Sequence, residues 1–99
     1  MAKKIVFEIE PSAGIKGYWL AVSKTDVIDV DNVEMENRSG SMMLEAGKTH
    51  LVFWWFIGNP GDSIKILAKD GDDTFFTIKK SSIPSGEYEG GGRERFTVP

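Results

Sequence analysis

The heptapeptide Leu51-Val52-Phe53-Trp54-Trp55-Phe56-Ile57 is apolar at every position. A strand with one face in water alternates apolar and polar residues, whereas a strand covered on both faces does not. The run is also far shorter than the ~20 residues that cross a membrane as a helix. The sequence therefore predicts a central β-strand that is covered on both sides, or covered on one side and in an interface on the other.

The rest of the chain has an apolar period of two residues, interrupted by turn-forming stretches such as Gly58-Asn59-Pro60-Gly61-Asp62 and Asp70-Gly71. The predicted strands are 5–9, 18–23, 26–36 with a phase shift at Asn32, 41–45, 51–57, 63–67, 74–79 and 95–98. A short helix over 32–37 is the second choice for its segment. Residues 80–92 are polar and end in three glycines, which predicts a long flexible loop.

Seven or eight short strands in 99 residues predict an all-β chain, a single-domain antiparallel β-sandwich that spans residues 1–99. The layout is similar to that of immunoglobulin-like or related Greek-key sandwiches, although the Cys…Trp…Cys spacing of immunoglobulin domains is absent. A small β-barrel is the alternative. The residues predicted to point inward and form the core are Phe7, Leu20, Val52, Phe53, Ile64, Ile66, Phe76, Ile78 and Phe96.

Composition excludes several classes of function. The chain has no cysteine and one histidine, His50, which excludes disulfides, thiolate metal sites and sites that need two imidazoles. A net charge of −3 argues against binding to nucleic acid through phosphates, so we expect no nucleic-acid partner. We also expect no membrane partner. No apolar signal segment follows Met1, which predicts a cytoplasmic protein, although a trimmed secreted protein or a virion protein would look the same.

No catalytic or metal-binding pattern stands out. His50 could be combined with Ser39 or Ser41, but no nucleophile-elbow sequence is present, and His50 fits a polar residue at the start of a buried strand. Acidic residues form two clusters, Asp26, Asp29, Asp31 and Glu34, and then Asp70, Asp72 and Asp73. Neither cluster has the spacing of a calcium-binding loop, and a solvated hairpin explains the second. We therefore expect no enzyme activity, no cofactor and no bound metal.

The tryptophans are the candidate functional residues. Neighbours on a strand point to opposite faces, so one of Trp54 and Trp55 belongs to the core and the other does not. Either the Val52/Trp54/Phe56 face or the Leu51/Phe53/Trp55 face then lies outside. The residues of a candidate interface or ligand platform are Tyr18, Trp19, Trp54, Trp55 and Phe56.

Two functions are consistent with such a platform. The first is a non-catalytic structural or assembly protein that self-associates, with a homodimer favoured, or docks on a larger complex through a protein partner. The alternative is a carbohydrate-binding module that stacks a sugar on Trp19 and on one of Trp54 and Trp55.

Overall fold

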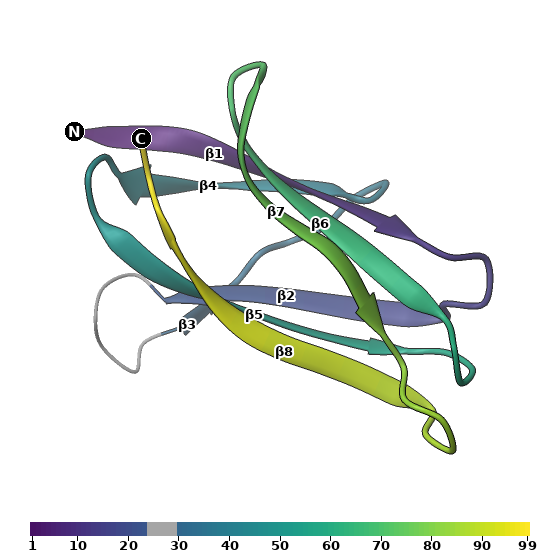
Figure 1. Cartoon of the computed structure of the whole chain (residues 1–99). Coiled ribbons are helices and arrows are strands. Elements are labelled where there is room, and N and C mark those ends of the chain that lie inside the picture. The colour runs from purple at the N-terminus through teal and green to yellow at the C-terminus, as the bar shows by residue number, and fades with distance from the viewer. Residues whose placement is uncertain (24–29) are drawn as a thin grey trace.

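Two four-stranded antiparallel sheets form the protein in a computed structural model, which describes residues 1–23 and 30–99. Figure 1 shows the sheets as two layers, with β1, β4, β6 and β7 in one layer and β2, β3, β5 and β8 in the other. The strands are β1 (Ala2–Pro11), β2 (Gly17–Ser23), β3 (Val30–Asn32), β4 (Ser39–Glu45), β5 (Thr49–Ile57), β6 (Ser63–Asp70), β7 (Asp73–Ser82) and β8 (Glu89–Thr97). The predicted all-β sandwich is confirmed, and the barrel alternative is not what the chain adopts.

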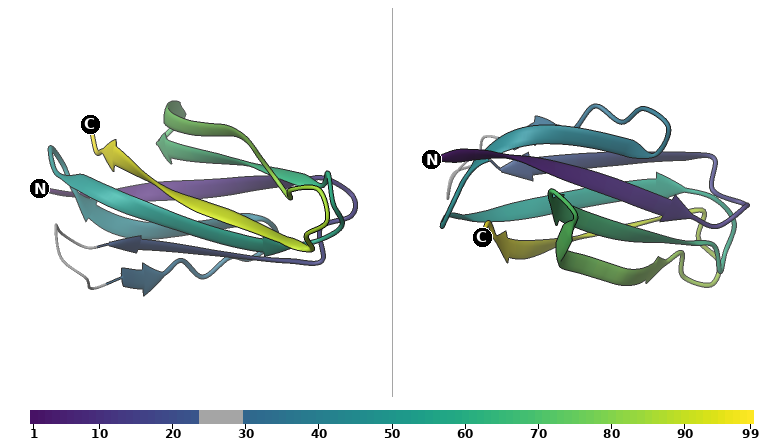
Figure 2. Two further views of the ribbon diagram at one scale, coloured as in Figure 1. Left: turned by 60° about the horizontal axis from the view of Figure 1, so that its bottom comes forward. Right: turned by 90° about the horizontal axis from the view of Figure 1, so that it is seen from above.

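The strand order is β4-β1-β6-β7 in one sheet and β3-β2-β5-β8 in the other. Most connections pass between the layers, as the turned views of Figure 2 show. This order differs from that of immunoglobulin constant domains, in which the first two strands share a sheet. β5 is a central strand, as its sequence predicts, with β2 on one side and β8 on the other.

The core lies between the layers and follows the two-residue period of each strand. In β1 the inward residues Ile5, Phe7 and Ile9 are buried, and the residues between them, Val6 and Glu8, are half-buried. The buried apolar residues of the described chain are Ile5, Phe7, Ile9, Leu20, Val22, Val33, Leu44, Val52, Phe56, Ile64, Ile66, Ala68, Ile78, Ile83, Phe96 and Val98. Two predicted core residues differ: Phe53 is half-buried at an outward position of β5, and Phe76 is half-buried at the edge of the core.

The prediction of a long loop at 80–92 is wrong in its extent. β7 continues to Ser82 and β8 begins at Glu89, which leaves a six-residue connection at 83–88. Ile83 at its start is buried, and its main-chain N–H donates to the Asp62 carbonyl at 2.8 Å. The glycines belong to β8 because large rings of β5 occupy the space that side chains at Gly90 and Gly92 would need.

The hairpin turn between β6 and β7 matches its sequence signal, and a second tight turn precedes β4. Asp70 pairs with Asp73 across the predicted turn of β6 and β7, where Gly71 has a φ of +63°. The Asp70 carboxylate accepts a hydrogen bond from Lys3 Nζ at 3.0 Å, so part of the second acidic cluster is paired within the chain. Before β4, Asn37 and Arg38 both have positive φ, as the tightest two-residue turns require. No helix forms at 32–37.

Candidate functional site

The two adjacent tryptophans of β5 point to opposite faces. Trp54 is half-buried and points inward, where its indole N–H donates to Ser81 Oγ of β7 at 3.0 Å. Trp55 points outward, and 39% of its surface is exposed. The Val52/Trp54/Phe56 face is therefore the inner one, and Leu51/Phe53/Trp55 is the outer one.

Trp55 stacks with Trp19 on the outside of the sheet. Trp19 of β2 is opposite Trp55 in the register, the two ring centroids lie 4.2 Å apart, and the ring planes differ by 36°. Trp19 is 48% exposed. On the other side of Trp55 the register partner is Gly91 of β8, which has no side chain. We call this row of three residues, Trp19, Trp55 and Gly91, the tryptophan rung.

Further apolar residues continue the surface on both sides of the rung. Together with Trp19 and Trp55, the outward apolar residues of β2 and β5 are Ala21, Leu51, Phe53 and Ile57, and we call this set the tryptophan face. A shallow hollow of about 160 Å³ is lined by Trp19, Ala21, Phe53, Trp54 and Trp55. The face is thus a continuous apolar strip with a dent beside the stacked indoles.

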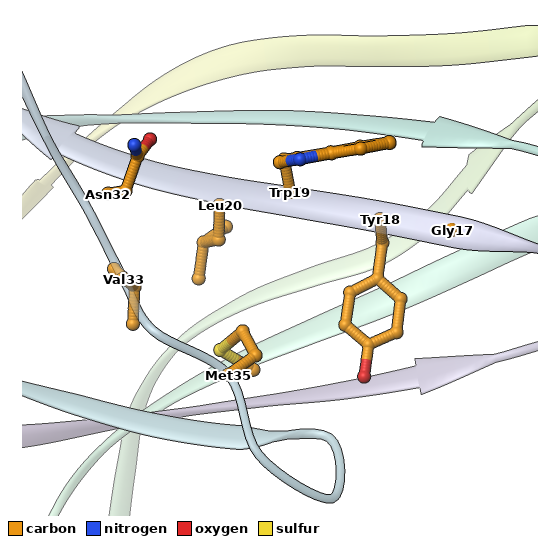
Figure 3. Close-up of a pocket in the computed structure, with 7 residues that line it drawn as sticks. All are labelled: Gly17, Tyr18, Trp19, Leu20, Asn32, Val33 and Met35. Carbon is orange, nitrogen blue, oxygen red and sulfur yellow. The ribbon is translucent and has the colours of Figure 1, made fainter.

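Polar groups border the tryptophan face. Asn32 of β3 is opposite Ala21, and Figure 3 shows its amide on the same side of β2 as the Trp19 indole. On β8 the outward positions are Glu89, Gly91, Arg93, Arg95 and Thr97, all exposed. The apolar strip therefore has an amide along one border and charged side chains along the other.

The outer face of the opposite sheet is different in kind. There Glu8 and Glu10 of β1 lie beside Lys69 and Lys65 of β6, with N–O distances of 3.1 and 3.8 Å. Charged side chains of this sort keep an outer sheet face in water. The tryptophan face carries no such pair among the residues that the structure describes.

Besides Trp54, two more of the predicted platform residues, Phe56 and Tyr18, lie off the outer face. Phe56 is fully buried at an inward position of β5, so it cannot form part of an exposed platform. Tyr18 is half-buried and packs against the core. In Figure 3 Tyr18 and Met35 lie on the other side of β2 from Trp19. An opening of about 360 Å³ runs along β2 beside the 32–35 segment, and Tyr18, Trp19 and Met35 are among its lining residues. Of the five predicted residues, only Trp19 and Trp55 lie together on the outside.

Sequence reasoning missed the rest of the face. Leu51, Phe53 and Ile57 share the face of Trp55 by simple alternation, but alternation does not choose between the two faces of β5, and the predicted core includes Phe53. The composition of residues 80–92 predicts a loop at Gly91, and Arg93 is predicted to share the wet face of the last strand with Arg95. The signal that could have found them is the two-residue period running back from Arg95 through Arg93 to Gly91.

The single histidine is enclosed, as its position in the sequence predicts. His50 is only 2% exposed, its Nδ1 donates to the Ser23 carbonyl at 2.7 Å, and its ring packs against Phe96. Ser39 and Ser41, the serines considered with it, belong to the other sheet.

The described residues hold no group of three or more side chains placed to bind a metal ion. Asp26 and Asp29 of the first acidic cluster lie outside the described residues.

Comparison of the chain with models of known protein families, with curated proteins and with solved structures gives no match. Within the described ranges, 1–23 and 30–99, no helix is long and apolar enough to cross a membrane.

Proposed function

We propose that this chain is a non-catalytic assembly module that self-associates through the tryptophan face. The observation that carries the proposal is the exposed, stacked pair Trp19 and Trp55 in the middle of an apolar sheet face. Large aromatic side chains in the centre of an apolar patch, with charges at its border, are typical of protein interfaces. The paired charges on the outer face of the other sheet show how the same chain builds a face that stays in water.

The exposed indoles are large enough to drive a weak association. A tryptophan buries roughly 150–250 Å², so the exposed fractions of 48% and 39% amount to roughly 130–220 Å² for Trp19 and Trp55 together. Covering that area contributes about 3–5 kcal/mol per copy at about 25 cal/mol per Å². Two copies together gain about 7–11 kcal/mol, which must exceed the estimated 4–15 kcal/mol cost of association.

The dimensions of the face also indicate a weak association. The six paired positions of β2 and β5 span about 20 Å, and three strands at a spacing of about 4.8 Å are about 14 Å wide. The projected area is about 300 Å², well under the ~800 Å² per partner of a standard interface. We therefore expect a reversible dimer with a Kd in the micromolar range or weaker.

Carbohydrate binding is the second candidate, supported by the Asn32 amide beside Trp19. A sugar ring needs a free aromatic face to stack on. Trp19 and Trp55 stack on each other, so each indole already gives one face to its neighbour. This arrangement favours a protein surface over a sugar as the occupant.

Sedimentation analysis tests the proposal over micromolar to millimolar protein concentrations. The unmodified chain should shift from its monomer mass of 11.0 kDa towards twice that mass. Trp55→Glu should stay folded by circular dichroism and remain monomeric, because it places a charge in the centre of the face. Trp54→Glu should unfold, because it places a charge inside the sandwich.

Met43→Glu is the matched control. Met43 is 62% exposed on the outer side of the other sheet, so the same charge is added away from the tryptophan face. This variant should dimerise like the unmodified chain. A chain that remains monomeric at every concentration would overturn the proposal, and saturable quenching of its tryptophan fluorescence by a sugar would then favour the second candidate.

A further inference from the structure

The charges along β8 are arranged with opposite signs about the tryptophan rung. Among the outward positions, Glu89 lies two residues before Gly91 and Arg93 lies two residues after it. Both side chains are exposed, and neither forms an ion pair with another described residue. The charges of this pattern are complementary to those of the same strand in a second copy that runs in the opposite direction.

We infer that two copies pack face to face about a two-fold axis that runs along the tryptophan rung, with Glu89 of each copy against Arg93 of the other. The inference rests on the proposed self-association and adds its geometry. A two-fold axis along the rung, perpendicular to the strands, places each strand over its own counterpart and reverses its direction. A residue two positions before Gly91 then faces the residue two positions after it in the second copy.

The apolar residues fit the same symmetry. Glu89 pairs with Ile57 and Arg93 pairs with Phe53 in the register of β5 and β8. The axis therefore brings Ile57 of one copy to Phe53 of the other, with the indoles of Trp55 together at the centre. Gly91 on the axis has no side chain, which leaves the edge of Trp55 open to the second copy.

The other in-plane axis fits less well. A two-fold axis parallel to the strands would place β8 over β2 of the second copy, since β8 and β2 flank β5. Arg93 would then face Ala21, which occupies the same level of the sheet, and its charge would meet an apolar side chain. Opposite charges across a contact help to select the partner and its register, so the charges of β8 select the axis along the rung.

Sheet twist does not disturb the match. Packed sheets keep their strands within about 30° of each other. Glu89 and Arg93 lie one strand spacing across and two residues along from the centre, about 8 Å away, so such a rotation moves each by about 4 Å relative to its counterpart. The flexible side chains of Glu89 and Arg93 span that displacement.

Charge reversal and mixing test the geometry. In a homodimer of Arg93→Glu, Glu89 faces the new glutamate twice, and in a homodimer of Glu89→Arg, two arginines meet twice. Each variant alone should dimerise about tenfold to a hundredfold more weakly than the unmodified chain. An equimolar mixture of the two should dimerise about as well as the unmodified chain, because every contact then joins opposite charges. Circular dichroism checks that both variants fold.

Net charge gives a control with the opposite sign of effect. Starting from −3, Arg93→Glu changes the net charge to −5 and Glu89→Arg changes it to −1. If overall repulsion decided the affinity, Glu89→Arg would associate more tightly, whereas a contact with Arg93 requires it to associate more weakly. Lys80→Glu makes the same change of net charge as Arg93→Glu. Lys80 is exposed on β7 of the other sheet, away from the tryptophan face, so this variant should leave the dimer intact.

The outcomes separate the two proposals. If the unmodified chain dimerises, Trp55→Glu is monomeric and the charge variants follow net charge alone, the axis along the rung is wrong and the tryptophan face stands. If the charge variants behave as expected but Trp55→Glu still dimerises, the copies pair through the edges of β8, and both the face-to-face axis and the proposed face are wrong. An unmodified chain that stays monomeric overturns both.

Discussion

Gly91→Ala is expected to destabilise the protein although Gly91 lies on the exposed edge strand. A Cβ at Gly91 would collide with the main-chain carbonyl oxygen of Trp54 and would lie 3.3 Å from the Trp55 Cα. These are main-chain atoms of β5, which is paired on both sides and cannot shift without moving β2 as well. At Gly92, in contrast, the atoms in the way belong to the Trp54 ring, which can turn.

The expected loss is about 2 kcal/mol. Forcing an additional carbon into a packed site costs about 1–3 kcal/mol, and a backbone obstacle places the cost near the upper end. Replacing glycine also lowers the conformational entropy of the unfolded chain, and this stabilises the folded state by about 0.4–1 kcal/mol.

Gly17→Ala is the control, because Gly17 occupies an outward position of the same sheet and its Cβ would lie 3.5 Å from the Trp19 ring, an ordinary contact. That variant should be neutral or more stable by up to about 1 kcal/mol.

Urea unfolding followed by tryptophan fluorescence measures both variants. It should be carried out at a protein concentration below the dimer Kd, because association would add to the apparent stability. With a slope of about 1–3 kcal/mol per molar urea, a loss of 2 kcal/mol lowers the midpoint by about 1–2 M. If Gly91→Ala and Gly17→Ala unfold within about 0.5 kcal/mol of each other, the close approach of β8 to β5 is wrong.

Four other substitutions test three separate parts of the structure. Arg38→Gly should raise the melting temperature, with a gain of about 0.5–1 kcal/mol, because Arg38 has a φ of +68° that glycine adopts without steric cost; a lower melting temperature would contradict that backbone. Phe56→Ala should cost about 3–5 kcal/mol in urea unfolding and Phe53→Ala about 1 kcal/mol, since only Phe56 is fully buried; equal losses would reverse the two faces of β5. Ser81→Ala should cost about 1 kcal/mol by removing the acceptor of the Trp54 indole, and an unchanged midpoint would show that this bond does not connect the layers.

The strands were predictable because their signal is local. Ile5, Phe7 and Ile9 alternate with residues of a different burial, and this pattern alone locates β1 and its inward face. The turn at Asp70-Gly71 likewise follows from two neighbouring residues. Such features depend on the steric preferences of short segments.

The faces of β5 were not predictable in the same way. Trp54 and Trp55 are both apolar, so the alternation of apolar residues does not show which of the two points into the core. The choice depends on β8, whose glycines lie more than thirty residues away and leave room for Trp54 on the inner side. Gly90-Gly91-Gly92 resembles a loop by composition, and only the rings packed against it explain why it forms a strand.

The three glycines connect the core to the proposed interface. Gly90 and Gly92 face inward, where a Cβ would come within 2.8 Å of the Phe56 ring and 2.7 Å of the Trp54 ring. Gly91 faces outward between them and leaves Trp55 without a neighbour on one side. Side chains at Gly90 and Gly92 would displace the rings of Phe56 and Trp54. A side chain at Gly91 would collide with the main chain of β5 and would also cover the edge of Trp55. Folding and the exposure of the tryptophan face therefore depend on the same short segment. The association of any glycine variant has to be compared with that of Trp55→Glu, because Trp55→Glu changes the face and leaves β8 unchanged.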